Sequence, residues 1–346
     1  MKQLTPGSVL VDVQGKTLTD EEAKRIQHPL VGGIILFARN YESPEQLCAL
    51  TQQIRAARPG PLLIAVDHEG GRVQRFRDNG FTHLPSMQDL GKYYDTEPML
   101  ALRAATEIGY VLAAELRACD VDLSFAPVLD LDYQVSTVIG SRSFHRNPTV
   151  VTLLAKSVIQ GMALAGMAAC GKHFPGHGFV DADSHIAIPV DERELEDILN
   201  EDSMPYTWLG DMVLPAVMPA HVIYPKVDSK NAGFSKIWLQ DILRQRLHYQ
   251  GMIFSDDLTM EGASVAGNIT DRAKAALSAG ADMVLVCNRP DLADQLLSQL
   301  DIPINPDSTQ RLLRLLPKQP FMSWPELQQY TRYQDARSYQ AQIFFK

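Results

Sequence analysis

Short apolar segments alternate with amphipathic helical segments along most of the chain. Residues 33–37 are a continuous apolar run, which is typical of a strand covered on both faces. Residues 98–117 instead carry apolar side chains at helical spacing. Eight strand–helix units predict a (β/α)₈ barrel of the TIM type, whose usual length is ~250 residues or more. The predicted strands are residues 8–13, 33–37, 61–66, 121–128 with a break at Pro127, a run ending at residue 170, 214–221, 251–257 and 282–288.

A doubly wound open sheet is the alternative architecture for such an alternation. A Gly-x-Gly-x-x-Gly motif after the first strand would favour it, and none is present. We therefore predict one α/β barrel domain over residues 1–300. Residues 301–346 are predicted to form a C-terminal extension packed on the barrel, with one or two helical turns at 311–316 and a final helix opened by a capping box at 323–326.

Composition excludes several classes of partner. The 346 residues carry a net charge of −9 and show no basic stripe, so no nucleic-acid partner is expected. No window is long and apolar enough for a membrane span, and the first residues lack the apolar core of a signal peptide. The cysteines Cys48, Cys119, Cys170 and Cys287 are far apart in sequence. We predict reduced, mostly buried thiols in a cytoplasmic protein.

The densest run of chemically active side chains is residues 171–185. Three of the nine histidines lie in it, together with a lysine and two aspartates. Pro175 blocks helix formation, and Gly176 and Gly178 allow backbone angles that other residues avoid. We therefore predict that a loop begins at Gly171, after a strand, which is a position typical of functional residues.

Other polar side chains also follow predicted strands. In a barrel the loops at the carboxyl ends of the strands share one face, so residues far apart in sequence are expected to converge there. Charged residues favour loops in any protein, but here they collect at the carboxyl ends, while the amino ends are plainer. These residues are Asp67, Arg75, Asp130, Arg142, Lys172, His173, His221, Asp256 and Asp257.

Asp256 and Asp257 end the seventh predicted strand. Because side chains alternate along a strand, one carboxylate is expected to point into the barrel mouth and the other away from it. The inward carboxylate is a candidate nucleophile or metal ligand. The outward one is a candidate helix cap or salt-bridge partner.

The histidines of the 171–185 stretch leave two chemical interpretations open. A metal site has weak support, because proline and glycine separate His173 from His177 and remove the helical geometry of a His-x-x-x-His site. Proton transfer is the other interpretation: Asp183 can accept a ring N–H of His185, which fixes the tautomer and raises the basicity of the imidazole. A solvated loop histidine is the plain alternative.

The remaining polar groups suit a neutral, polyhydroxylated substrate. Lys172 and His173 can donate hydrogen bonds to hydroxyl oxygens, and Arg75 and Arg142 can do so in bidentate fashion. Asp67 can accept two hydroxyl protons from adjacent carbons of a sugar ring. No phosphate-cradling glycine loop is present.

Several of these blocks together resemble glycoside hydrolase family 3. Lys-His-Phe-Pro-Gly-His-Gly at 172–178, followed by Asp-Ser-His at 183–185, is similar to the signature of its single-domain bacterial β-N-acetylglucosaminidases of cell-wall recycling. Between residues 9 and 288 the resemblance continues, in the right order, through residues 31–41, 67–75, 125–130, 218–224 and 253–258.

The resemblance implies a retaining exo-β-N-acetylglucosaminidase, a β-N-acetylhexosaminidase, that removes terminal GlcNAc from peptidoglycan fragments such as GlcNAc-anhydro-MurNAc, with or without peptide. It implies Asp256 as the nucleophile and His185, paired with Asp183, as the acid/base. No cofactor or metal is expected, and the chain is expected to act as a monomer. The residues implied to hold the sugar are Asp67, Arg75, Arg142, Lys172 and His173.

One position departs from the family pattern, which commonly has glutamine where His68 stands beside Asp67. A histidine there still offers a hydrogen-bond donor. The sequence after Asn288 matches no block of the pattern, which leaves its role open. Two rival functions remain: a metal-dependent barrel hydrolase that uses the histidine cluster and Asp256, and a sugar-binding barrel without catalysis.

Overall fold

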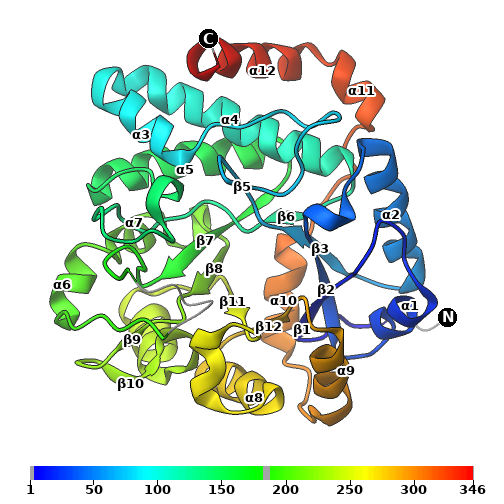
Figure 1. Ribbon diagram of the computed structural model, residues 1–346, viewed down its shortest axis with the longest axis vertical. Helices are drawn as coiled ribbons and strands as arrows, with labels where there is room; N and C mark the ends of the chain where they lie inside the picture. The colour runs from blue at the N-terminus through cyan, green and yellow to red at the C-terminus, as the bar shows by residue number, and fades with distance from the viewer. Residues whose placement is uncertain (1–3, 182–187, 346) are drawn as a thin grey trace.

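The structure, a computed structural model, describes residues 4–181 and 188–345. Eight parallel strands close into a barrel in the order β1-β12-β11-β8-β7-β6-β3-β2, with helices around it (Figure 1). The predicted (β/α)₈ barrel is therefore confirmed. The barrel strands are β1 (Val9–Asp12), β2 (Val31–Leu36), β3 (Leu63–Val66), β6 (Leu123–Ser124), β7 (Ala168–Phe174), β8 (Ala216–Pro219), β11 (Met252–Asp257) and β12 (Met283–Val286).

Helices connect the strands and cover the outside of the barrel (Figure 1). Side chains of Thr19, Ser43 and Asn147 cap the amino ends of α1, α2 and α5, which explains where these helices begin. The helices are α1 (Asp20–Ile26), α2 (Pro44–Ala57), α3 (Met87–Thr96), α4 (Pro98–Ala118), α5 (Pro148–Leu164), α6 (Leu195–Asn200), α7 (Met204–Val213), the π-helical η4 (Ile237–Arg246), α8 (Ile269–Ala279), α9 (Pro290–Gln299), α10 (Pro306–Leu315), α11 (Trp324–Gln329) and α12 (Thr331–Phe344).

Short elements occupy the connections after several strands. Two antiparallel hairpins, β4–β5 and β9–β10, lie outside the barrel sheet. The short elements are β4 (His68–Gly70), β5 (Val73–Gln74), β9 (Ile223–Tyr224), β10 (Asp228–Asn231) and the 3₁₀ turns η1 (Ala38–Asn40), η2 (Gly140–Arg142), η3 (Ala232–Phe234) and η5 (Glu261–Ala266).

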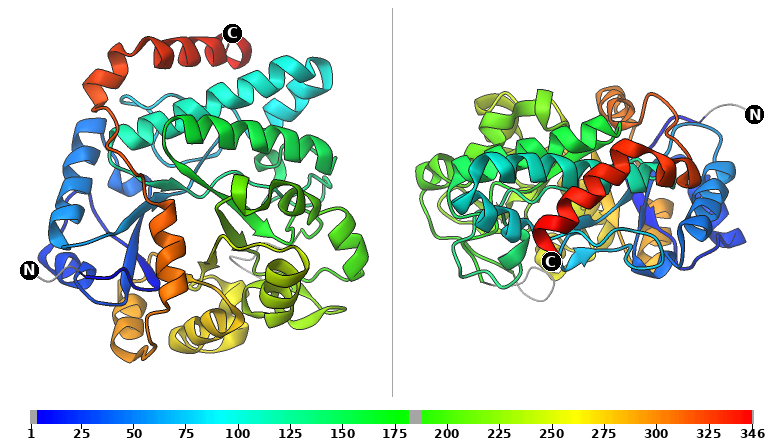
Figure 2. Two further views of the ribbon diagram at one scale, coloured as in Figure 1. Left: turned by 180° about the vertical axis from the view of Figure 1, so that it is seen from behind. Right: turned by 90° about the horizontal axis from the view of Figure 1, so that it is seen from above.

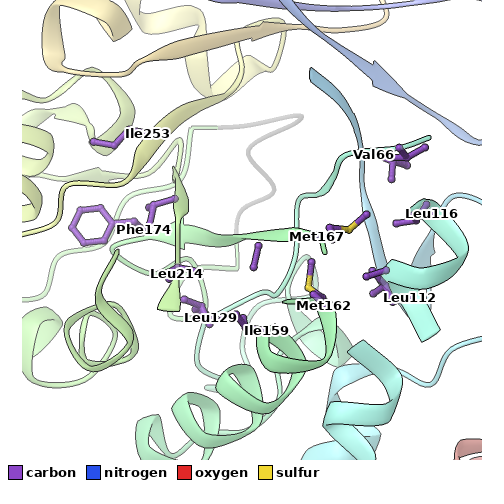
Figure 3. Packing of buried hydrophobic residues seen from close by; sticks show 14 of the residues in the cluster. Val66, Leu112, Leu116, Leu129, Ile159, Met162, Met167, Phe174, Leu214 and Ile253 are labelled. Atoms are coloured by element: carbon purple, nitrogen blue, oxygen red, sulfur yellow. The ribbon is translucent and has the colours of Figure 1, made fainter. Parts of the chain in front are cut away.

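Alternating strand side chains divide the core into two layers. Phe254 packs in the cluster inside the barrel, whereas its neighbour Ile253 packs in the cluster between barrel and helices. Figure 3 shows part of this outer layer, with Leu112 and Leu116 of α4 on the side that faces Val66 of β3. Strands buried on both faces explain why the sequence shows continuous apolar runs.

Helix α10 closes the amino end of the barrel. Leu312 and Leu315 are buried in the interior cluster of the barrel. Asp282, directly before β12, accepts hydrogen bonds from Ser308 (2.7 Å) and Arg311 (2.8 Å) of α10. The left view of Figure 2 shows α10 across the barrel, on the side opposite to that seen in Figure 1. The carboxyl ends of the strands and their loops lie at the other end.

Helices α11 and α12 pack along the outer side of α4 (Figure 1). Buried Glu115 of α4 accepts hydrogen bonds from Tyr333 of α12 (2.6 Å) and from Thr82. Trp324 of α11 lies 5.2 Å, between ring centroids, from Phe81. In the described part of the chain no helix is both long and apolar enough to cross a membrane.

Two predicted strand boundaries are wrong. The strand expected at 121–128 is reduced to Leu123–Ser124, because Pro127 has no N–H to give to a ladder; the chain meets the barrel again only at a bridge between Val128 and Lys172. Conversely, β7 continues through Phe174, so Gly171 does not begin a loop. Lys172 and His173 therefore lie on the strand itself.

The prediction for the C-terminal extension also needs correction. Beyond residue 300, α10 is longer than the one or two turns expected, and the final helix is divided into α11 and α12.

Candidate active site

A cavity of about 710 Å³ lies at the carboxyl ends of the barrel strands. Asp67 follows β3, Lys172 and His173 end β7, and Asp256 lies near the end of β11. Loops bring in the other candidates, Arg75 just after the β4–β5 hairpin and Arg142 from η2. The structure thus brings Asp256 and the five predicted sugar-binding residues together around one cavity, as the shared face of a barrel requires.

A cluster of two carboxylates and two deep cations forms one side of the cavity. Lys172 Nζ lies 2.7 Å from both Asp67 Oδ1 and Glu69 Oε1. Arg142 donates to Glu69 in bidentate fashion through Nε and Nη2, both at 2.8 Å. Arg75 Nη2 lies further out, 3.6 Å from Asp67 Oδ2.

This cluster keeps its members charged. Burial alone raises the pKa of the Glu69 carboxyl, but Arg142 and Lys172 outweigh it and hold the pKa well below its usual value. Burial likewise lowers the pKa of the Lys172 ammonium, but Asp67 and Glu69 bring it above the usual value. The cavity therefore presents fixed donors from Lys172 and the arginines, and a carboxylate at Asp67, to a ligand.

A second buried carboxylate, Asp130, holds the end of β7. Its Oδ2 lies 2.7 Å from His173 Nδ1, and its Oδ1 accepts the backbone N–H of His177 at 2.7 Å. The backbone N–H of His173 also donates to Asp130, at 3.2 Å. Asp130 and both imidazoles are at least nine-tenths buried. Burial lowers the pKa of His177, whose ring nitrogens have no hydrogen-bond partner among the described residues.

The carboxylates of Asp256 and Asp257 take different positions, as the alternation of side chains along a strand predicts. Asp256 has the same strand parity as Phe254 in the barrel interior, and it lines the cavity. Asp257 reaches the cavity rim, but its carboxylate accepts hydrogen bonds from Thr259 N (2.9 Å), Thr259 Oγ1 (2.8 Å) and Cys287 N (3.2 Å). Burial raises the pKa of Asp257 to about 6 despite these bonds. Asp257 is thus engaged in holding the loop.

Two histidines lie away from the cavity. His221, which was expected to converge on it, is fully buried, with Nε2 3.1 Å from the carbonyl oxygen of Asp257. The imidazole of His68 packs against Phe76 and Phe81, and burial lowers its pKa to about 3. The expectation that His68 offers a donor beside Asp67 is wrong, because strand alternation turns the two side chains to opposite sides.

The predicted acid/base pair, Asp183 and His185, lies outside the described residues. Within residues 4–181 and 188–345, no three histidine, cysteine, aspartate or glutamate side chains are grouped as metal ligands. Glu69 was not among the predicted site residues. Its spacing, two residues after Asp67 in one polar segment, was the available signal, because residues i and i+2 of an extended chain share a side.

Comparison with known proteins assigns the family. The model of the glycosyl hydrolase family 3 N-terminal domain matches residues 2–315. A β-hexosaminidase of Bordetella parapertussis is 66% identical over 340 residues, which cover 98% of this chain and 96% of that protein. A β-hexosaminidase of Chromobacterium violaceum is 55% identical over 324 residues, 94% of this chain and 90% of that protein.

Solved structures agree. NagZ from Neisseria gonorrhoeae in complex with N-trifluoroacetyl-D-glucosamine superposes with a TM-score of 0.94 at 48% identity, covering 99% of both chains. The same protein in complex with zinc ion gives a TM-score of 0.92 at 46% identity, again over 99% of both chains. The predicted family is confirmed: the chain belongs to glycosyl hydrolase family 3 and is a glycoside hydrolase.

Proposed function

We propose that the protein is a retaining exo-β-N-acetylglucosaminidase that removes non-reducing terminal GlcNAc from peptidoglycan fragments, namely GlcNAc-anhydro-MurNAc with or without peptide. The observation that carries the proposal is the convergence of Asp256 with Asp67, Arg75, Lys172 and their neighbours on one cavity. The names of the relatives support a hexosamine: those from Bordetella are β-hexosaminidases, and NagZ was solved with a glucosamine derivative.

The shape of the cavity supports action on the end of a glycan. Ile35, Phe125 and Met218 belong to the interior of the barrel and also line the cavity. These apolar side chains form a floor, so a sugar chain cannot pass through. A blind cavity of this kind suits a single terminal sugar, with the rest of the substrate outside.

The charged cluster supports recognition of hydroxyl groups. Lys172, Arg75 and Arg142 supply donors whose positions are fixed by Asp67 and Glu69. In a buried site each such hydrogen bond discriminates against a ligand that leaves the group unpaired, by ~1–3 kcal/mol. Neutral sugars offer many hydroxyl groups to such a site.

In the proposed mechanism, a carboxylate oxygen of Asp256 attacks C1 of the bound sugar. The bond from C1 to the glycosidic oxygen breaks, and His185, oriented by Asp183, gives its proton to the leaving oxygen. Water then attacks C1 of the glycosyl-enzyme, gives a proton back to His185 and releases Asp256. Two displacements at C1 retain the anomeric configuration. The roles of His185 and Asp183 rest on the family resemblance.

A panel of aryl β-glycosides, with and without the 2-acetamido group, tests the substrate. We expect turnover of the β-GlcNAc glycoside and a large loss when a hydroxyl replaces the acetamido group. Asp67→Ala should lower kcat/KM about tenfold to a hundredfold, because it removes an acceptor from the site. Binding of GlcNAc without turnover of any glycoside would instead favour the non-catalytic sugar-binding barrel.

Exhaustive chelation tests the rival metal-dependent hydrolase. We predict full activity after treatment with a chelator, because proline and glycine between His173 and His177 remove the helical geometry of a zinc site. Loss of activity on chelation, followed by its recovery with one divalent ion, would favour the metal-dependent hydrolase.

We further propose that the protein works as a monomer in the cytoplasm. The four cysteines Cys48, Cys119, Cys170 and Cys287 are free, which suits a reducing compartment. Light scattering at working concentration and fractionation of cells that express the protein check these two points.

A further inference from the structure

Asp130 is placed to decide which nitrogen of His173 carries a proton. An ionised carboxylate can only accept hydrogen bonds, so His173 Nδ1, 2.7 Å from Asp130 Oδ2, must be the donor. Burial alone raises the pKa of the Asp130 carboxyl, but His173 and the hydrogen bonds from the β7 end bring it below the usual value, so the carboxylate is ionised at neutral pH. Nδ1 of His173 is then protonated.

The other nitrogen of the same ring is turned to the cavity. His173 lines the cavity, and the described residues give its Nε2 no hydrogen-bond partner. In a neutral imidazole whose Nδ1 carries the proton, Nε2 is an acceptor. Asp130 therefore determines whether Nε2 of His173, which it does not contact, acts as a hydrogen-bond acceptor.

In the charged cluster, the carboxylate acceptors are already partly engaged by cations. Lys172, Arg75 and Arg142 offer only donors, and the carboxylate of Asp67 is partly engaged by Lys172 and Arg75. A sugar hydroxyl has a proton to give as well as lone pairs. In the neutral form of the His173 imidazole, Nε2 can accept a hydrogen bond from such a hydroxyl group.

We propose that Asp130 is a positioning residue that fixes His173 as the Nδ1–H tautomer, so that Nε2 accepts a hydrogen bond from a substrate hydroxyl. The proposal rests on the proposed function for the identity of the ligand. The tautomer itself is a property of the free protein.

Asp130→Asn is the decisive variant. Its amide oxygen can still accept the backbone N–H groups of His173 and His177, which preserves the end of β7. Its NH₂ group would face Nδ1 and donate to it, so the proton would move to Nε2 and the acceptor would become a donor. A role limited to holding the backbone predicts no change of tautomer.

The first measurement is ¹⁵N NMR of histidine-labelled protein at neutral pH, with the His173 signals identified by their loss in His173→Gln. We expect a protonated Nδ1 and an unprotonated Nε2 in the wild type, and the reverse in Asp130→Asn. A proton on Nε2 in the wild type, or an unchanged tautomer in the variant, would overturn the proposal. The wild-type spectrum decides even where the variant fails to fold.

The second measurement is steady-state kinetics with an aryl β-GlcNAc glycoside. Asp130→Asn should lower kcat/KM about tenfold to a hundredfold. In a His173→Gln background it should cause little further loss of kcat/KM, because both changes remove the same interaction with the substrate. Full additivity of the two losses would contradict the proposal.

Asp132→Asn is the matched control. Asp132 lies two residues further along the same segment and accepts hydrogen bonds from Gln88 (3.3 Å) and Gln134 N (2.9 Å), not from a histidine. In Asp132→Asn, the tautomer of His173 and the kinetics should match those of the wild type. A wild-type protein that shows the predicted tautomer but hydrolyses no β-GlcNAc glycoside would refute the proposed function and leave the role of Asp130 standing.

Discussion

Glu69 determines how the two deepest cations of the cavity are held. It bridges Lys172 and Arg142 with three contacts of 2.7–2.8 Å, and its side chain is 2% exposed. Glu69→Gln keeps the shape but removes the charge between two cations. We expect kcat/KM for an aryl β-GlcNAc glycoside to fall about tenfold to a hundredfold, because charge-assisted hydrogen bonds are lost in a buried site.

Glu201→Gln is the comparison for this variant, since Glu201 pairs with Arg146 at the surface (2.7 Å), away from the cavity. It should leave kcat/KM unchanged. Equal kinetics in the two variants would show that Glu69 does not position the binding groups.

At the residue scale, the sequence predicted which side chains meet but not what holds them. Lys172, His173 and Asp256 could be placed, because strand ends converge and side chains alternate. The partners could not: Glu69 reads as one more loop acid, and the pairing of Asp130 with His173 spans 43 residues. Such pairs depend on tertiary geometry that no local pattern encodes.

Among the helices and strands, we expect α10 to contribute to the stability of the fold but not to catalysis. Leu312 is 1% exposed inside the barrel, at the end opposite to the cavity. Leu312→Ala should lower the free energy of unfolding by about 2–5 kcal/mol, because it leaves a void among packed side chains. Urea titration measures this, and kcat/KM below the transition should stay near the wild-type value.

Arg314→Ala on the exposed side of α10 is the control, with an expected change within ±0.5 kcal/mol. A Leu312→Ala protein as stable as this control would mean that α10 does not close the barrel.

The contact of α12 with α4 should make stability depend on pH. Burial raises the pKa of Glu115 to about 7, against 4.5 for an unperturbed glutamate. The folded protein holds this proton more tightly than the unfolded chain, so stability present at low pH is lost as the pH rises from about 4.5 to about 7. Glu115→Gln removes the titration, and at pH 8 it should be more stable than the wild type by of the order of 3 kcal/mol.

Melting temperatures of both proteins at pH 5 and pH 8 check this, with Glu97→Gln, an exposed position just before α4, as the control. The gain in melting temperature should be larger at pH 8 than at pH 5. A gain of the same size at both values would show that Glu115 does not titrate in this range.

The regular strands could be predicted better than their interruptions and than helix α3. Continuous apolar runs are enough to count eight strands, because each is buried on both faces. The sequence indicated a break at Pro127 in the strand at 121–128, but not that β6 keeps only Leu123–Ser124. Helix α3 was not predicted, although Ser86 and Asp89 form a capping box at its start.

For the molecule as a whole, the barrel separates stability from chemistry. Its amino end is closed by α10, and its carboxyl end carries the cavity with Asp256 and the charged cluster. The proposed covalent catalysis on a terminal sugar would use the carboxylate of Asp256 in this blind cavity. We therefore propose that Asp256 becomes glycosylated during turnover.

Trapping the intermediate tests this claim most directly. The enzyme is incubated with an activated 5-fluoro glycoside of GlcNAc, digested, and mapped by mass spectrometry, and the anomer first released from an ordinary substrate is followed by NMR. We predict one adduct, on Asp256, a retained β-anomer, and no adduct in Asp256→Ala, whose kcat should fall ~10⁴-fold or more. An adduct on Asp257 or elsewhere, or release of the inverted anomer, would contradict the account.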